Sequence, residues 1–254
     1  MTKHIYAAHP DNHDKSKDFL YSVHLPAEQL AVLPPSGNLS HRPQPSIYDQ
    51  GDIGSCVDNA GCALLGFVEA KEGNSVELFS RLFAYFMARG GVPQDEGSTL
   101  FDFMAGIKRK GICVETDWPY DTTKVFDVPP AAAFANAKPR EAGLTYYRLS
   151  TLSDMKTCIT QNYPFFFGIS VYESFESPGP NAEGMIPMPN TAKEQLLGGH
   201  ALTCMGYDDS KQALYFRNSW GTDWALSGWA WLPYAYVQNA NLFSDCWTIR
   251  KIAK

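Results

Sequence analysis

The sequence predicts an α+β fold in which a helical part is followed by a part rich in strands. Between residues 56 and 111 the apolar residues recur at the spacing of amphipathic helices. From residue 165 onward they form short runs rich in aromatic and β-branched residues, a pattern typical of strands. A stretch rich in proline and alanine at 129–139 separates the two patterns, so we expect a linker there.

The helical part is expected to contain three helices. The first begins at Cys56, after a turn, and carries apolar residues at helical spacing up to residue 71. The second ends at the glycine pair 90–91, and the third runs from a cap at Ser98 or Thr99 to Gly111. Basic residues precede Gly111, where they favour the end of a helix, and they are not interpreted as a nucleic-acid patch.

The strand-rich part is expected to hold five strands and one helix. The strands are predicted at 165–172, 201–207, 213–217, 228–232 and 246–251, and the helix at 152–162. A long loop with several prolines, 174–195, leads directly to His200. It either borders a functional site at that histidine or is an ordinary surface loop.

Residues 1–45 are predicted to form an irregular arm that wraps a surface. They contain several prolines and five of the six histidines, and they lack sustained helical periodicity. His9 and His13 have the spacing of a metal-binding pair on a helix, but Pro10 and Asp11 disfavour that helix. We therefore predict no metal site, and no residue pattern calls for a cofactor.

Composition limits the partners and the compartment. The net charge of −6 and the isoelectric point near 5.5 argue against nucleic acid or an anionic membrane as the main partner. The polar stretch 1–18 lacks the apolar core of a signal peptide, and no segment approaches a membrane span. We expect synthesis in the cytoplasm and six reduced cysteines; export without a classical signal peptide, for example as an effector, stays open.

Four residues supply the parts of a cysteine acyl-transfer site. A thiol needs a base to deprotonate it, and the base needs a third group to fix its tautomer, roles that suit Cys56, His200 and Asn218. Gln50 lies six residues before Cys56, so its amide could bind an oxyanion together with the Cys56 N–H. A thiol in the first turn of a helix, next to an imidazole, is expected to rest as a Cys–His ion pair.

These residues and their surroundings resemble the papain-like cysteine peptidases, peptidase family C1. The resemblance rests on the stretch 50–56, on Gly198-Gly199-His200-Ala201 and on Asn218-Ser219-Trp220-Gly221, in the family's order, and it extends from about Pro45 to the C-terminus. The short bacterial members, which have an N-terminal arm, look most similar. The resemblance implies a helical lobe and a β-barrel-like lobe with the active-site cleft between them.

The resemblance also implies the boundaries and further site residues. The arm would span 1–45, the helical lobe with the nucleophile 46–125, and the β-rich lobe with the histidine and asparagine 126–254. Gly97 and Ser98 would bind the substrate backbone, although the Ser98 side chain could narrow the cleft. The other predicted contacts with substrate are Leu100, Gly199 and Ala201 around a side-chain pocket, and Trp220 and Trp224 on the leaving-group side.

One departure from the family pattern concerns a disulfide. Ile53 and Asp95 occupy positions where secreted members carry disulfide-forming cysteines, so that bridge is absent here.

The expected function is hydrolysis of protein or peptide substrates by a cysteine endopeptidase that forms a thioester at Cys56. The pocket residues are apolar or small, so we expect an apolar preference two residues before the cut. Two other classes stay open, a non-proteolytic acyl-transfer enzyme such as a ligase, amidase or aminopeptidase, and a catalytically silent binding module. Residues 1–45 could inhibit the site by occupying the cleft, could be cut away, or could pack on the β-rich lobe.

Overall fold

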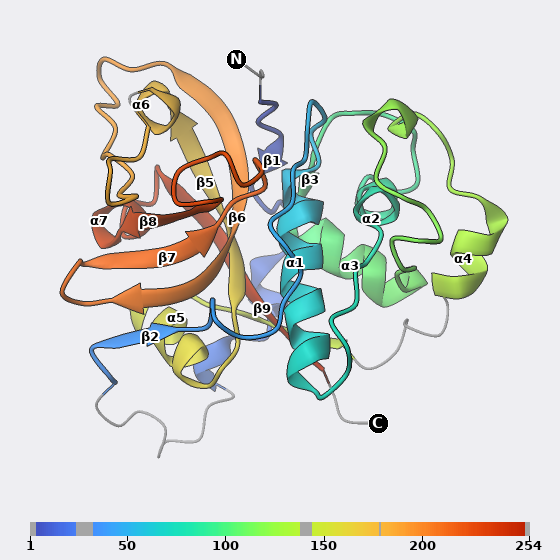
Figure 1. Cartoon of the computed structure of the whole chain (residues 1–254), viewed down its shortest axis with the longest axis horizontal. Helices are drawn as coiled ribbons and strands as arrows, with labels where there is room; N and C mark the ends of the chain where they lie inside the picture. Colours follow the sequence, from blue (N-terminus) through green and yellow to red (C-terminus); the bar gives the residue numbers. More distant parts are fainter. Residues whose placement is uncertain (1–3, 24–32, 138–143, 178, 252–254) are drawn as a thin grey trace.

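A computed structural model describes residues 4–23, 33–137, 144–177 and 179–251 of the chain. Figure 1 shows α2 (Arg81–Ala88), α3 (Leu100–Lys110) and α4 (Ala131–Ala137) on one side and a large sheet with three short helices on the other, with α1 (Cys56–Lys71) between them. Every residue of α1 from Cys56 to Val68 is buried, because the helix contacts other helices on one face and the sheet on the other. The predicted α+β class is confirmed.

The helical lobe is built from the expected helices, of which α2 and α3 begin at capping side chains. Ser80 accepts a hydrogen bond from the Phe83 N–H at the start of α2 (Arg81–Ala88), and Thr99 caps α3 (Leu100–Lys110) in the same way. Gly111 ends α3 at a φ of 72°, a conformation that favours glycine. The first helix, α1, therefore lies beside two helices whose ends are fixed by local hydrogen bonds.

A helix lies shortly after the boundary predicted between residues 125 and 126. Residues 131–137 form a further helix, α4 (Ala131–Ala137), where we expected a linker. The Phe134 ring packs edge-on against Phe83 and Phe86 of α2, with centroids 5.3 and 6.3 Å apart. An alanine run has a high helix propensity, and its burial against α2 assigns it to the helical lobe.

The second lobe is a seven-stranded antiparallel sheet. Its order is β4-β9-β5-β6-β7-β8, and β2 pairs with β6 off this path. The strands are β2 (Ser36–Asn38), β4 (Leu144–Arg148), β5 (Phe165–Tyr172), β6 (Leu196–Asp208), β7 (Ala213–Arg217), β8 (Trp229–Pro233) and β9 (Phe243–Lys251). Within the described residues β4 and β8 do not pair, so the lobe expected to be barrel-like is a large antiparallel sheet and no closed barrel.

Short helices complete this lobe. They are α5 (Leu152–Thr160), α6 (Glu173–Glu176) and α7 (Tyr234–Val237). Thr151 and Asp154 form a capping box at the start of α5, which explains why the sequence signals this helix clearly. No helix in the described part of the chain combines the length and the apolar character that a membrane crossing requires.

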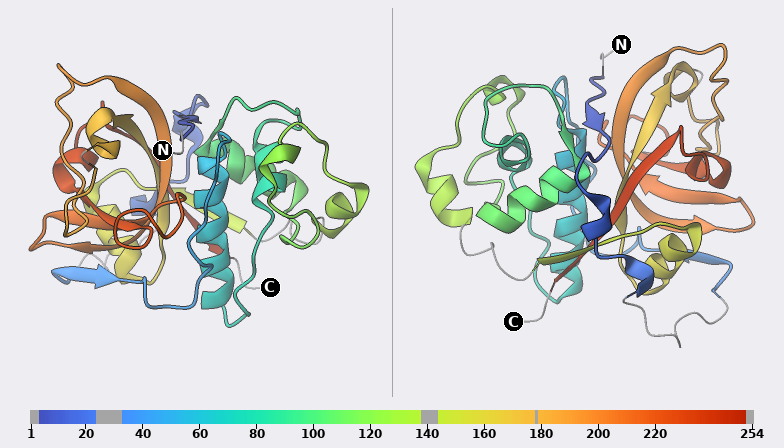
Figure 2. Two further views of the ribbon diagram at one scale, coloured as in Figure 1. Left: turned by 45° about the horizontal axis from the view of Figure 1, so that its top comes forward. Right: turned by 180° about the vertical axis from the view of Figure 1, so that it is seen from behind.

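The N-terminal arm runs between the two lobes, as Figure 2 shows from behind. Its first strand, β1 (Ala8–His9), pairs in parallel with β3 (Ser98–Thr99) of the helical lobe. On the other side Ala7 forms a bridge with Gly199 of β6. Further along the arm come two short 3-10 helices (Lys15–Lys17 and Tyr21–Val23) and then β2. The arm therefore contacts both lobes at their junction.

Candidate active site

Cys56 is the first residue of α1 and is completely buried. Three backbone amides, those of Ala201, Ala7 and Val57, favour its thiolate form. Burial outweighs them and raises the pKa of Cys56 to about 11. The sulfur therefore lies where β6, α1 and the arm meet, and it is held there as a thiol.

His200 lies on β6, Asn218 directly follows the neighbouring strand β7, and the two side chains form a fixed pair. The His200 Nε2 is 2.7 Å from the Asn218 Oδ1, and that oxygen also accepts a hydrogen bond from the Ser219 N–H. Since the oxygen is an acceptor, Nε2 carries the proton of the neutral ring, and Nδ1 is the basic nitrogen. Within the described residues the buried Nδ1 has no hydrogen-bond partner, so it is free to take the thiol proton.

The two titrating groups are held neutral in this structure. Burial lowers the pKa of His200 to about 4, against the raising effect of Asn218. With the pKa of Cys56 near 11, the neutral thiol and the neutral imidazole are favoured at pH 7. The ion pair predicted from sequence is therefore not the favoured state while the arm covers the site.

Gln50 is buried and held at both ends of its amide. Its Oε1 accepts a hydrogen bond of 2.8 Å from the Ser219 hydroxyl, which orients the Nε2 as a donor. The Nε2 donates to the carbonyl oxygens of Ile53 and, in the arm, Ile5. The Tyr120 hydroxyl donates a hydrogen bond to the Gln50 backbone carbonyl and so fixes the loop. A preorganised donor of this kind can stabilise an oxyanion.

The arm occupies the surface predicted to bind the substrate backbone. The Ser98 N–H donates to the Ala7 carbonyl at 3.1 Å. A Cβ on Gly97 would overlap the Ala7 carbonyl oxygen, and one on Gly199 would overlap that of Ala8. Only glycines allow an extended chain to approach both walls so closely.

Ser98 does not narrow the cleft, because its side chain turns into the helical lobe. The residue is buried, and its hydroxyl donates to the Asp58 Oδ2 at 3.2 Å. Asp58 lies two residues after Cys56 and is fully buried, and burial raises its pKa to about 8. Sequence reasoning missed this carboxyl, although an acidic residue beside the nucleophile in a buried helix was a usable signal.

The buried Asp58 should make the protein less stable as the pH rises. Between the usual carboxyl pKa of 3.8 and about 8, the folded chain keeps a proton that the unfolded chain releases. The free energy of unfolding should fall with pH over this range, by up to about 1.4 kcal/mol per pH unit. Asp58→Asn should reduce this slope, measured by urea unfolding at several pH values. Asp52→Asn, at an exposed site, is the control, and parallel profiles for Asp58→Asn and wild type would contradict the interpretation.

A second unpredicted carboxylate joins the nucleophile loop to the substrate wall. The Asp95 Oδ1 accepts hydrogen bonds from the Gly54 N–H at 2.8 Å and from the Tyr85 hydroxyl at 2.6 Å. The Tyr85 hydroxyl in turn accepts from the Gly97 N–H at 2.9 Å. Asp95 therefore positions the loop before Cys56 directly and Gly97 through Tyr85. It does so at the place where the family disulfide is absent.

The residues predicted to line the side-chain pocket are small or apolar in the structure. Leu100 and Ala201 are buried, and Gly199 lies against Ala8 of the arm. Gly168 was not predicted, but a Cβ there would meet the Ser244 hydroxyl and approach Leu100 to 3.9 Å. Sequence patterns gave no signal for Gly168 or Ser244, because they reach the pocket through strand pairing between β5 and β9.

Trp220 and Trp224 form an aromatic cluster on the other side of His200. The Trp220 ring stacks on His200 with centroids 4.9 Å apart, and Trp224 meets it edge-on at 5.4 Å. Phe175 packs against both tryptophans. These aromatic rings keep water away from the buried hydrogen bond between His200 and Asn218.

Comparisons with known proteins agree with this geometry. Residues 45–246 match the family described as papain family cysteine protease. The chain is 33% identical over 219 residues to an uncharacterised peptidase C1-like protein of Acanthamoeba polyphaga mimivirus, covering 82% of this chain and 70% of that protein.

Solved structures of cysteine proteases are also similar to this chain. Xylellain, a cysteine protease from Xylella fastidiosa, is similar with a TM-score of 0.88 and 32% identity, over 98% of this chain and 96% of that one. A digestive procathepsin L 3 from the larval midgut of Tenebrio molitor has a TM-score of 0.69 over 93% of this chain and 74% of its own. At 18% identity, the second likeness concerns the fold alone.

Proposed function

The chain belongs to the papain family of cysteine proteases, and from this premise we propose that it is an endopeptidase whose nucleophile is Cys56. The observation that carries the proposal is the arrangement around His200, whose Nε2 is fixed by Asn218 and whose Nδ1 is left open. Cys56 lies at the backbone amide of the next residue, Ala201, and Gln50 is held by Ser219, which follows Asn218. Protein substrates follow from the family; the residue roles and the selectivity are the proposal.

The mechanism follows from the donors and acceptors present. His200 takes the thiol proton at Nδ1, and the Cys56 thiolate attacks the peptide carbonyl. The Gln50 Nε2 and the Cys56 N–H bind the oxyanion, which collapses to a thioester as the His200 imidazolium protonates the leaving amine. Neutral His200 then removes a proton from water, which hydrolyses the thioester and releases the acid. Asn218 keeps the ring in the tautomer that each step needs.

We infer an apolar preference at the residue two positions before the cut. The pocket offers Leu100, Ala201 and glycines, and no charged side chain is among its named members. A peptide library digested by the chain, with the cut sites read by mass spectrometry, should show internal cleavage after sequences with Leu, Val or Phe at that position. Cleavage confined to acidic or basic residues there would contradict the inference, and cleavage only at peptide ends would favour an exopeptidase.

We further propose that the N-terminal arm inhibits the enzyme. The Ile5 carbonyl occupies the Gln50 donor at 3.3 Å, and the Ala7 carbonyl occupies the Ser98 N–H. Both groups are needed by a substrate, so the arm and a substrate exclude each other. The parallel pairing of β1 with β3 supports the proposal that this segment lies in the cleft as an inhibitor and is not cut as a substrate.

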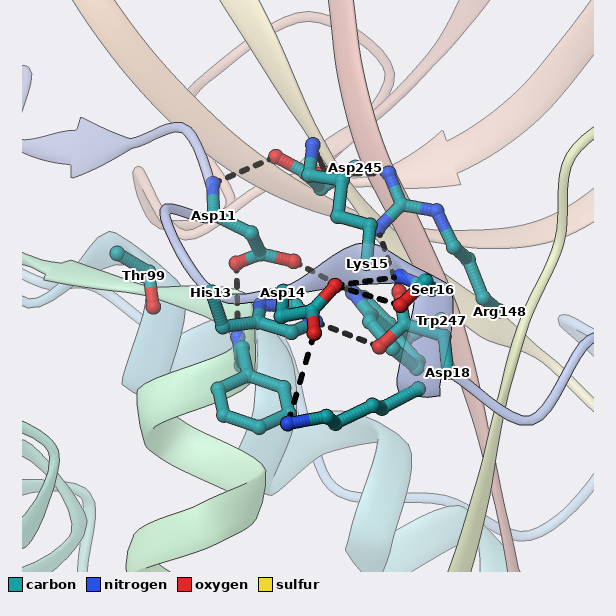
Figure 3. A network of polar contacts seen from close by, with 12 residues as sticks. Asp11, His13, Asp14, Lys15, Ser16, Asp18, Thr99, Arg148, Asp245 and Trp247 are labelled. Carbon is teal, nitrogen blue, oxygen red and sulfur yellow. Dashed lines mark hydrogen bonds and ion pairs between the residues drawn. The ribbon is translucent and has the colours of Figure 1, made fainter.

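A polar network beyond the cleft anchors the arm. Figure 3 shows that Asp11 and Lys15 of the arm converge on Asp245, which Arg148 also contacts. The buried Asp11 carboxylate accepts hydrogen bonds from the Phe101 N–H at 2.9 Å and from the Trp247 Nε1 at 2.8 Å. Because these partners belong to the helical lobe and to β9 respectively, Asp11 attaches the arm to both lobes.

A further inference from the structure

The leaving-group side of the cleft contains an aromatic surface that the arm covers. The His4 ring lies flat on the Trp220 ring, with centroids 4.0 Å apart and an interplanar angle of 7°. Ile5 follows at the Gln50 donor, and Ala7 and Ala8 lie at the opposite wall. His4 is therefore on the side of Cys56 away from Gly97 and Ser98, where the residues after the cut would bind.

Acidic side chains surround this aromatic surface. The Glu176 carboxylate, at the end of α6, accepts a hydrogen bond from the Tyr6 hydroxyl. Glu176 and Asp49 both act to raise the pKa of His4, although burial lowers it more. Both carboxylates are thus close enough to the Trp220 surface to attract a cation on it.

Arg81 lies near Asp49 but does not neutralise the negative charge of Asp49 and Glu176. Arg81 reaches the Asp49 backbone carbonyl at 3.4 Å, but its guanidinium pairs with Glu115 at 2.9 Å. Its planar group is also enclosed by the rings of Tyr48 and Tyr120, 4.3 and 3.9 Å from their centroids. The Glu176 carboxylate is exposed and has an arm residue, Tyr6, as its contact, so it is released when the arm leaves.

We propose that Trp220 and Glu176 form a cation-accepting subsite that selects a basic residue in the first two positions after the cut. The inference rests on the proposed peptidase function. Once the arm has left, a guanidinium can stack on the indole face that His4 covers and pair with the carboxylate at its edge. Trp220 supplies the aromatic surface, and the negative charge of Glu176 makes the subsite favour a cation. Glu176 is thus a specificity-determining residue, and it takes no part in the bond cleavage itself.

The test uses quenched fluorescent peptides that differ only after the scissile bond, where they carry Arg, Gln or Glu. The full chain is assayed, and mass spectrometry checks that the cut stays at one bond. An arm that blocks part of the molecules lowers kcat/KM for every peptide by the same factor. The ratio of kcat/KM values for the Arg and Glu peptides is therefore independent of how much enzyme is open.

The Arg peptide should be cleaved about tenfold more efficiently than the Glu peptide at low salt. The ratio should fall as salt screens the exposed carboxylate. Glu176→Gln should reduce the ratio to about threefold or less, because the indole face remains. Glu183→Gln is the control. It removes another exposed carboxylate, in the loop where the Glu183 N–H donates to Asn181, and should leave the ratio unchanged.

A wild-type ratio near one, or a ratio that Glu176→Gln leaves intact, would overturn the subsite. If a folded chain carrying Asp11→Ala, which loosens the arm, also cleaves none of the peptides, the proposed function is refuted, and the subsite with it.

Discussion

Replacing Cys56 with alanine should abolish peptide hydrolysis, with a fall in kcat/KM of at least about 10⁴-fold. Without the sulfur no thioester forms, and the remaining donors can only polarise a carbonyl for direct attack by water. His200→Ala should have an effect of similar size, because the two residues act as one unit and their losses do not add. Initial rates on a fluorogenic peptide with Leu two residues before the cut measure both variants.

Cys113→Ala provides the matched control for Cys56. It removes another buried thiol from the helical lobe, away from the cleft, and should keep wild-type kcat/KM. Circular dichroism and thermal unfolding establish that each variant is folded. Wild-type activity in a folded Cys56→Ala chain would show that a different group performs the reaction.

Replacing Asp11 with alanine should activate the full chain, by about 100-fold at neutral pH. The variant loses two hydrogen bonds to a buried carboxylate, each worth about 1.5–3 kcal/mol. The loss falls mainly on the closed state, because the Phe101 N–H and the Trp247 Nε1 stay buried without an acceptor only while the arm is docked. Hydrolysis of the same fluorogenic peptide, compared with wild type at equal concentrations, measures the change.

Asp14→Ala is the control for the arm. Asp14 is exposed in the same segment, and its carboxylate contacts Ser16 and Lys17 of the arm itself. It should therefore leave the activity within about twofold of wild type. Equal activity of the wild-type, Asp11→Ala and Asp14→Ala chains would mean that the arm does not restrain the enzyme.

Much of the fold was predictable because its signals are local. The caps of α2, α3 and α5 and the glycine at the end of α3 are encoded within a few residues of each helix end. The open sheet and the place of α4 were not predictable in this way. They depend on which surfaces meet in three dimensions, such as the packing of Phe134 on α2.

The same distinction applies to the candidate site. Motif order and spacing suggested Gln50, Cys56, His200 and Asn218. The structure pairs His200 with Asn218 and holds Gln50 through Ser219, the residue after Asn218. Cys56 lies at the backbone amide of Ala201, the residue after His200. The neutral state of the thiol and imidazole was not predictable, because it results from burial, to which an arm about fifty residues before Cys56 and about 190 residues before His200 contributes. The contacts of Asp58 and Asp95 were missed for a similar reason, since each joins a loop or helix to a wall segment about forty residues distant.

The most direct test of the account is the rate at which a peptidyl epoxide modifies the full chain at pH 7, read by intact mass and peptide mapping. Because burial raises the pKa of Cys56 to about 11, the closed chain favours the unreactive thiol at pH 7, and the arm lies at the peptide site as well. We therefore predict slow modification of wild type, modification of Asp11→Ala at least about tenfold faster, and a single adduct at Cys56. A folded Asp11→Ala chain without an adduct, or with its adduct on another cysteine, would contradict the account.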